Sequence, residues 1–133
     1  MFEVSATSSF SAAHQLRLPD RSAEPLHRHN WRVTVTYAGS VLDEMGVLVD
    51  FDALRARLDR LLATLNDQNL NTLPAFAERN PTAENVALHI AERLAVELPA
   101  AAALKCVEVE EAPGCLARYS PPHEASSNDE ASF

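Results

Sequence analysis

Two histidines, His27 and His29, stand two residues apart at the start of a segment that runs from Leu26 to Tyr37. Successive side chains of a strand point to opposite faces, so both share a face with the apolar row that follows: Trp31, Val33, Val35 and Tyr37. A solvated histidine would fit better among the arginines and threonines of the other face. The placement indicates two imidazoles directed at one partly dry site, where they can share a metal ion. Two half-buried histidines bonded to backbone groups would give the same pattern.

A third histidine, His14, closes the segment from Phe2 to His14, in which apolar and polar residues alternate as in a strand. His14 falls on the less polar face of that segment. The first strand would therefore end at His14 and the second begin at His27 and His29, with a loop between them. Zinc with three protein ligands and an open fourth position is the catalytic arrangement, because water or substrate must reach the metal. We predict that these three histidines bind zinc.

One acid, Glu111, is placed unlike its neighbours. It continues the apolar row of Val107 and Val109 at the end of a strand predicted over residues 104–111, whereas Glu108 and Glu110 fall on the opposite face. An ionised carboxylate in an apolar row needs a partner that satisfies it. In the alternative interpretation the turn at 112–114 begins there and frees the side chain into water.

The elements that would position these groups follow in the order strand, strand, helix, helix, strand, strand. Asp50 is a plausible N-cap of the first helix, whose buried stripe is expected to run from Phe51 to Leu65. The second helix is expected to begin at Thr82 and to continue past Leu98 until Pro99 stops it. A β-hairpin over 104–119 closes the chain. The fold class is therefore α+β, with four antiparallel strands backed by two helices on one face.

Composition limits the function. A chain of 133 residues with 47% hydrophobic residues fits one domain, predicted over residues 1–119, and residues 120–133 have the composition of a disordered tail. The net charge of -8 argues against nucleic-acid or membrane partners. Four arginines around the histidines are either solvated surface residues or an attraction for an anionic ligand: Arg17, Arg21, Arg28 and Arg32. Two cysteines and no signal-like segment lead us to expect a cytoplasmic protein.

Six short motifs resemble the 6-pyruvoyl-tetrahydropterin synthase and 6-carboxytetrahydropterin synthase family of tunnelling-fold proteins. The resemblance covers residues 2–119 and implies a ββααββ subunit whose copies pair edge to edge into a β-barrel. Two trimers then stack as a hexamer, with active sites between subunits. The motifs are Phe10-Ser11-Ala12-Ala13-His14, His27-Arg28-His29-Asn30, Gly46-Val47-Leu48-Val49-Asp50-Phe51, Leu65-Asn66-Asp67-Gln68-Asn69-Leu70-Asn71, Asn80-Pro81-Thr82-Ala83-Glu84-Asn85 and Glu111-Ala112-Pro113.

The resemblance also implies roles for single residues. His14, His27 and His29 would hold a zinc ion that polarises the side-chain hydroxyls of a dihydropterin such as 7,8-dihydroneopterin triphosphate. Glu111 would anchor the pterin ring, whose aminopyrimidinone edge offers two adjacent N–H donors to a carboxylate. Thr82 matches a threonine that helps to bind the ring in relatives.

The sequence departs from the family at the catalytic positions. The usual cysteine base and the Asp-His pair that supports it are replaced by Ala23, Asn66 and Asp67, and Arg28 stands where relatives have glycine. Glu24 lies three residues before His27, as in bacterial relatives that use a glutamate to cleave the dihydropterin side chain by a retro-aldol route. Two hypotheses remain. One is a zinc-dependent lyase or aldolase with Glu24 as base and Asp67 as its assistant, and the other is a catalytically degenerate pterin-binding homologue.

Overall fold

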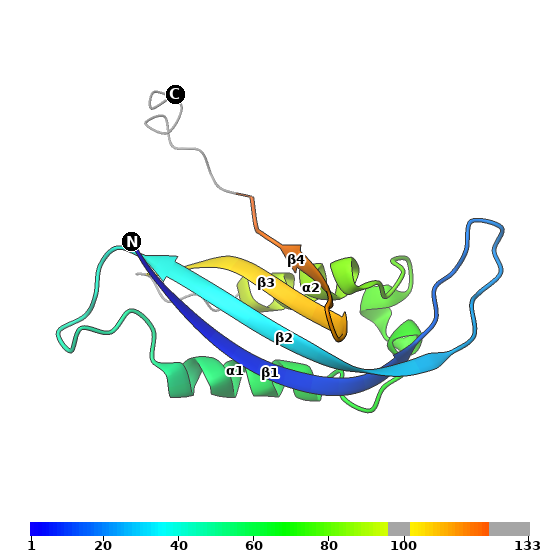
Figure 1. Ribbon diagram of the computed structural model, residues 1–133, viewed down its shortest axis with the longest axis horizontal. Coiled ribbons are helices and arrows are strands. Elements are labelled where there is room, and N and C mark those ends of the chain that lie inside the picture. The colour runs from blue at the N-terminus through cyan, green and yellow to red at the C-terminus, as the bar shows by residue number, and fades with distance from the viewer. Residues whose placement is uncertain (96–101, 123–133) are drawn as a thin grey trace, which may run out of the picture.

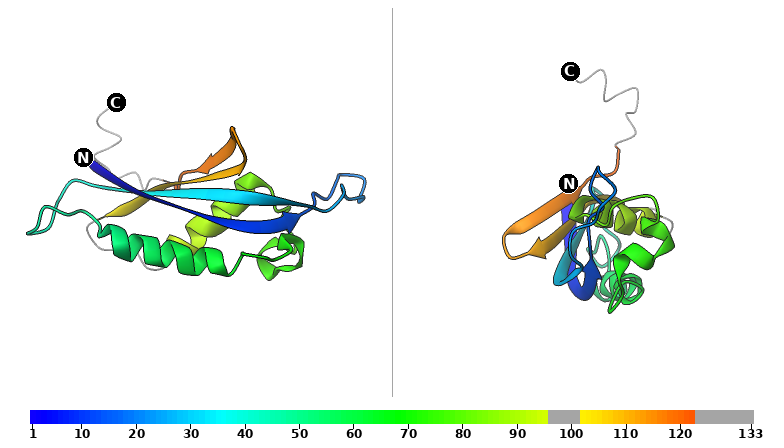
Figure 2. Two further views of the ribbon diagram at one scale, coloured as in Figure 1. Left: turned by 60° about the horizontal axis from the view of Figure 1, so that its bottom comes forward. Right: turned by 90° about the vertical axis from the view of Figure 1, so that its right-hand side faces the viewer.

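The computed structural model describes residues 1–95 and 102–122, which form one antiparallel sheet with two helices on one face (Figure 1). The strands are β1 (Phe2–His14), β2 (His27–Gly39), β3 (Ala103–Ala112) and β4 (Cys115–Tyr119), in the spatial order β1-β2-β3-β4. Helix α1 (Phe51–Ala63) packs against β1, and α2 (Ala83–Leu94) packs against β3 and β4. Figure 2 shows both helices on the same side of the sheet. The predicted α+β fold is confirmed.

Strands β1 and β2 pair without interruption from Phe2 opposite Gly39 to His14 opposite His27. Because the register is continuous, alternation holds along both strands, and the apolar row of β2 is fully buried under the helices: Trp31, Val33, Val35 and Tyr37. The row ends at His29 and His27. The strand that carries two of the predicted ligands is therefore fixed by the core itself.

Helix α1 begins as predicted, with the Asp50 carboxylate accepting the N–H of Asp52. Leu54, Leu58 and Leu62 are buried, but the prediction that Phe51 belongs to the same stripe is wrong, since its side chain is 61% exposed. Phe51 is the first helical residue. One turn later, Leu54 is only 2% exposed, so the buried stripe begins there.

Helix α2 has Thr82 as its N-cap, and the Thr82 hydroxyl accepts the N–H of Asn85. The described helix ends at Leu94, with Ala95 as its C-cap, and Leu98 and Pro99 lie outside the described residues. Residues 123–133, most of the predicted tail, are also outside them. Two 3₁₀ helices, Leu70–Thr72 and Pro74–Phe76, connect α1 to α2. No described helix has the length and apolar character needed to span a membrane.

Strand β3 contains two irregularities, and both place a charged residue outside regular pairing. Pairing with β2 passes from Cys106 to Leu104 and skips Lys105. Pairing with β4 passes from Glu110 to Ala112 and skips Glu111. A β-bulge changes the direction of the side chain at the extra residue. The second bulge thus separates Glu111 from the regular rows of its strand.

Candidate functional site

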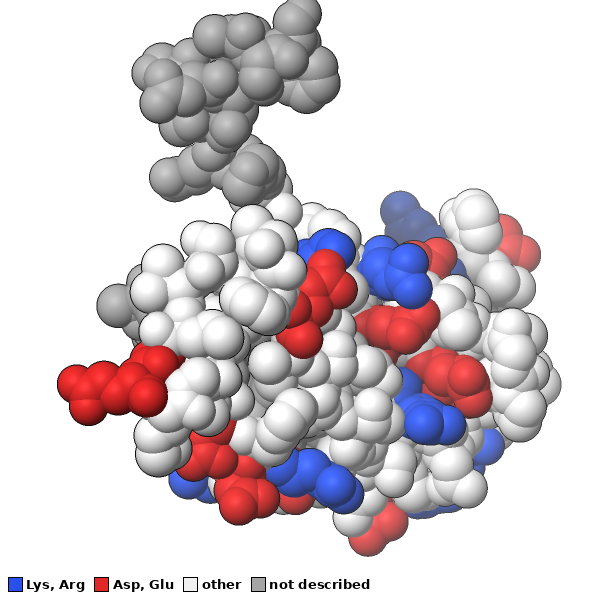
Figure 3. Space-filling view, turned by 60° about the vertical axis from the view of Figure 1, so that its left-hand side comes forward, with Lys and Arg blue, Asp and Glu red and all other residues white. Residues whose placement is uncertain are grey.

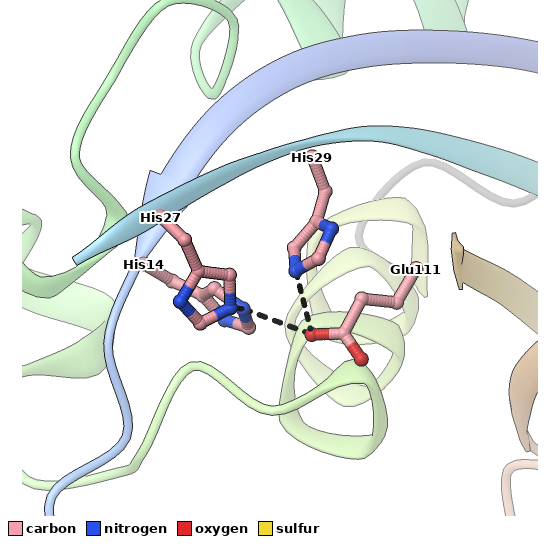
Figure 4. Close-up of side chains that lie close together, drawn as sticks. All are labelled: His14, His27, His29 and Glu111. Atoms are coloured by element: carbon pink, nitrogen blue, oxygen red, sulfur yellow. Dashed lines mark hydrogen bonds and ion pairs between the residues drawn. The ribbon is translucent and has the colours of Figure 1, made fainter. Parts of the chain in front are cut away.

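His14, His27, His29 and Glu111 converge at one end of the sheet (Figure 4). One ligand atom from each lies within 4.8 Å of the other three. The Nε2 atoms of His14 and His27 are 3.0 Å apart, and Glu111 Oε1 lies 2.9 Å from His14 Nε2 and 3.6 Å from His29 Nε2. Three predicted metal ligands and the odd acid of the sequence therefore share one site.

The sheet register explains why these side chains meet. His14 is directly opposite His27 at the open end of the β1–β2 pair, and His29 follows one strand repeat later on the same face. Glu111 comes from the neighbouring strand, at the bulge where β3 leaves its pairing with β4. The edge of the Trp31 ring lies under His14 and His29, with ring centroids 4.9 and 5.7 Å away. The cluster is thus the end of the apolar core.

The hydrogen bonds of two histidines show which ring nitrogen carries the proton. Nδ1 of His14 is 2.7 Å from the carbonyl oxygen of Pro81, and Nδ1 of His27 is 2.9 Å from that of Pro25. A carbonyl oxygen only accepts, so the hydrogen-bond network assigns the proton to Nδ1 in both rings. Each Nε2 then directs a lone pair into the cluster, as in metal-binding histidines held by backbone carbonyls.

Acceptor atoms therefore face one another in this site. The lone pairs of His14 and His27 meet at 3.0 Å, and the Glu111 carboxylate, also an acceptor, meets His14 at 2.9 Å. Such contacts are repulsive unless a cation lies between them. A proton on one ring can bridge two of these atoms, whereas a divalent metal can bind one atom from each of His14, His27, His29 and Glu111. The donor set of imidazole nitrogens and a carboxylate fits zinc.

His29 is 25% exposed, and burial lowers its pKa below the ordinary histidine value. Glu111 opposes this shift, while His14 and His27 act in the same direction as burial. A lowered pKa keeps the imidazole neutral near pH 7, and the neutral ring is the form that binds a metal.

Glu24 is held at the rim of the cluster. Its Oε1 accepts the N–H of Leu16 at 3.1 Å, its own N–H donates to the Leu16 carbonyl at 3.0 Å, and Oε1 lies 3.8 Å from His27 Nε2. The loop between β1 and β2 thus fixes both backbone and side chain of Glu24. A carboxylate in this place can exchange a proton with a group bound at the cluster.

Asp67 lies elsewhere within one chain. Its Oδ1 is 3.3 Å from the guanidinium of Arg28, and its side chain is 74% exposed. Arg28 also donates to the Ser11 hydroxyl at 3.1 Å, on the sheet face opposite the histidines. The charge of Arg28 is therefore directed away from the cluster, although the residue stands between two of the ligands. The role of Asp67 as assistant to Glu24 stays a prediction.

A cleft of about 440 Å³ opens beside Glu111, between the start of α2 and strand β4. Its lining includes Glu111, Ala83 and Ala117. Thr82 directly precedes this start of α2, and although its oxygen caps the helix, the hydroxyl proton can still donate to a ligand. Of the two residues predicted to bind a ring, Glu111 therefore lines the cleft, and Thr82 directly precedes the lining residue Ala83.

Sequence reasoning missed the groups that hold the site in place. The carbonyls of Pro25 and Pro81 orient His27 and His14, and a side-chain pattern cannot predict a backbone carbonyl contact. Two asparagines clamp the chain that leaves β1: Asn71 bonds both backbone groups of Gln15, and Asn80 bonds both backbone groups of Arg17. Both asparagines belong to motifs that the sequence analysis identified, but the sequence did not reveal that they bind the backbone after β1.

The fold and the site define a class, an antiparallel ββααββ protein with three histidines and a glutamate gathered where its first two strands open. The family model described as 6-pyruvoyl tetrahydropterin synthase matches residues 3–122. The chain belongs to this family.

Curated relatives and a solved structure agree with this assignment. A dihydroneopterin monophosphate aldolase of Pyrococcus furiosus is 35% identical over 98 residues, which cover 74% of this chain and 79% of the relative. A 6-carboxy-5,6,7,8-tetrahydropterin synthase of Synechocystis is 35% identical over 119 residues, 86% of this chain and 89% of the relative. The structure of Caenorhabditis elegans 6-pyruvoyl tetrahydropterin synthase matches with a TM-score of 0.80 and 26% identity, covering 91% of this chain and 96% of that one.

Proposed function

We propose that the protein binds a dihydropterin and cleaves the side chain of dihydroneopterin, free or phosphorylated, by a metal-dependent retro-aldol reaction. The convergence of ring nitrogens from His14, His27 and His29, with the Glu24 carboxylate at its rim, carries this proposal. The name of the Pyrococcus furiosus relative supports the reaction class. The product would be a 6-hydroxymethyl-dihydropterin together with a two-carbon aldehyde.

The reaction needs one base and one acid. Glu24 accepts the proton of the hydroxyl on the second side-chain carbon, the bond between the first and second side-chain carbons breaks, and its electron pair passes into the ring imine. The second carbon becomes the aldehyde, and the first carbon, which stays attached to the ring, takes up a proton from the protonated Glu24. A divalent metal held by the three histidines would supply Lewis-acid polarisation of the hydroxyls.

Ring binding falls to the cleft beside the cluster. In the proposal, Glu111 accepts two adjacent N–H groups of the aminopyrimidinone edge, because an ionised carboxylate can receive both at once. Thr82 donates its remaining hydroxyl proton to the ring. Both residues lie where the start of α2 faces β3 and β4, so the ring would bind beside the metal and its side chain would extend toward the histidines.

A second candidate is pterin binding without turnover. It is favoured by Ala23, which cannot accept a proton, and by Asn66, which bonds the Ser11 N–H at 3.0 Å and so has a structural role where relatives have a catalytic acid. Asp67 is paired with Arg28. If Glu24 is not a base, the site has no replacement for the cysteine base and the Asp-His pair of the family.

Incubation with dihydroneopterin and its monophosphate and triphosphate separates the two candidates. The zinc-loaded protein should release 6-hydroxymethyl-dihydropterin from at least one of them, as measured by liquid chromatography with mass detection. Glu24→Gln should lower kcat by about 10²–10⁴-fold while leaving pterin binding in place. Glu44→Gln, an exposed acid in another loop, serves as a matched control. Pterin binding by the zinc-loaded wild type without product would overturn the aldolase proposal and support the second candidate.

We also propose that six copies assemble as two stacked trimers. The open sheet supports this, because β1 and β4 are terminal strands whose edges another copy can extend. Sedimentation velocity should give about six times the 14.5 kDa chain mass. A monomer at micromolar concentration would overturn the assembly without bearing on the cluster, which one chain forms by itself.

A further inference from the structure

Glu111 faces the histidines rather than the cleft in which its proposed pterin partner would lie. Its Oε1 is 2.9 Å from His14 Nε2 and 3.6 Å from His29 Nε2, and its side chain is 30% exposed (Figure 4). The cleft lined by Glu111, Ala83 and Ala117 opens beside the same side chain. The carboxylate therefore contacts the histidines and also borders the cleft.

Glu111 stands at the bulge in β3. Pairing with β4 joins Glu110 to Leu116 and Ala112 to Cys115, so Glu111 is the extra residue. Pairing with β2 ends one residue earlier, at Glu110 opposite Arg32. Glu110 stays in the ladder and lines a separate pocket with Arg32 and Thr34 on the opposite face. The two adjacent glutamates thus lie on opposite faces of the strand, as alternation requires, and of the two only Glu110 is paired with β4.

One carboxylate cannot serve both partners fully. Acceptance of two adjacent ring N–H groups uses both oxygens of the Glu111 side chain. Ligation of zinc or a similar ion uses at least one of them, at about 2.0–2.2 Å. With three histidines, a carboxylate ligand completes a four-coordinate site of the closed type, which leaves no position for a substrate hydroxyl.

We propose that Glu111 is the fourth ligand of the metal when no pterin is bound, and that the pterin ring withdraws it and so opens the coordination position for the side-chain hydroxyls. This inference rests on the proposed function and adds a gate to it. Because Glu111 leaves the metal only when it binds the ring, water meets an open metal only in the presence of a pterin.

The first test measures the metal ligand directly. Metal-free wild type, Glu111→Gln and Glu110→Gln are titrated with Co²⁺, whose visible absorption reports its coordination. Wild type and Glu110→Gln should bind Co²⁺ alike, with the spectrum of a four-coordinate ion, and Glu111→Gln should bind at least about tenfold more weakly with an altered spectrum. Circular dichroism verifies that all three proteins are folded. Equal affinities and equal spectra in the three proteins would overturn the proposal.

The second test measures withdrawal of the ligand. We use 6-methylpterin, which offers the ring N–H groups but no side-chain hydroxyl that could bind the metal. Added to the Co²⁺-loaded wild type, it should change the absorption spectrum, with a midpoint at the concentration where calorimetry detects binding. Binding with an unchanged spectrum would overturn the gate.

The two tests separate this inference from the proposed function. If neither 6-methylpterin nor dihydroneopterin binds the wild type, the proposed function fails and the withdrawal step fails with it. The Co²⁺ titration of Glu111→Gln against Glu110→Gln still decides whether Glu111 is a metal ligand.

Discussion

The two faces of the sheet carry ionisable groups in different arrangements. On the face without helices, acids lie beside cations: Glu108 is 2.8 Å from Arg118, and Asp67 is 3.3 Å from Arg28. On the helix-covered face at the end of β1 and β2, Glu111 lies beside histidine nitrogens that present lone pairs. Figure 3 shows acidic and basic side chains interspersed on the surface in view. The first arrangement pairs opposite charges, whereas the second brings a carboxylate together with lone-pair nitrogens.

This difference identifies a site more securely than residue type does. A surface ion pair satisfies its own charges and indicates little about function. A group of acceptors held together by register and by two backbone carbonyls is an arrangement that a bound cation would stabilise. Arg28 and His27 illustrate the contrast, because they are adjacent in the sequence and belong to different arrangements.

The largest expected effect comes from breaking the two arrangements at these adjacent residues. His27→Ala should weaken zinc binding by more than about 100-fold, because it removes a ligand rather than a supporting group. Its side chain is 40% exposed, so the fold should tolerate the change. Arg28→Ala should leave zinc affinity within about twofold, because its charge is directed to Asp67 and Ser11. Competition with a chelating dye measures both affinities.

The outcome that contradicts this contrast is specific. If Arg28→Ala changes zinc affinity as much as His27→Ala does, the charge of Arg28 acts on the cluster on the other face of β2. If neither variant changes it, zinc is bound elsewhere on the protein.

A smaller effect is expected from the clamp that holds the end of β1. The Asn71 side chain accepts the N–H of Gln15 at 2.9 Å and donates to the Gln15 carbonyl at 2.8 Å. Asn71→Ala removes both hydrogen bonds and should lower the free energy of unfolding by about 1–3 kcal/mol. Gln68→Ala in the same loop is the control, because the bond that Gln68 Nε2 donates, to the Asn66 carbonyl, is 3.5 Å long. Urea unfolding measures both. Equal losses would mean that the loop, and not the clamp, supports the site.

Alternation along the strands predicted most of the site. It placed His14, His27 and His29 on the core face, and the register that joins His14 to His27 confirms this. It also marked Glu111 as the acid out of place. Periodicity is informative here because β1 and β2 pair without a bulge and one of their faces is buried.

Features outside periodicity could not be predicted. Alternation gave the face of Glu111, but the bulge that leaves it without a partner on β4 has no signature in that pattern. The backbone carbonyls of Pro25 and Pro81 have no side-chain signature. Phe51 satisfied the helical period but is the first residue of α1 and stays 61% exposed, so spacing alone assigned it to the core.

On the face without helices, Glu108→Gln should matter little. The pair with Arg118 is a surface ion pair, since the Arg118 side chain is 58% exposed, and its loss should lower the free energy of unfolding by no more than about 1 kcal/mol. The difference should shrink further in 1 M salt. A loss several times larger, or one that salt does not reduce, would show that Glu108 does more than form a surface ion pair with Arg118.

The smallest effect concerns His89, a histidine outside the cluster. Its ring packs against Phe76, with centroids 5.4 Å apart, and burial, aided by Arg93, lowers its pKa below the ordinary value of 6.5. The unfolded chain therefore binds a proton at His89 at higher pH than the folded chain does, so this group reduces stability as the pH falls through 6.5 and has no such effect well above it. Metal-free wild type should thus lose more stability than His89→Gln between about pH 7.5 and 5. Because both proteins contain the same cluster, its contribution cancels in the difference. A pH-independent difference in urea midpoints would show that His89 has the same pKa in both states.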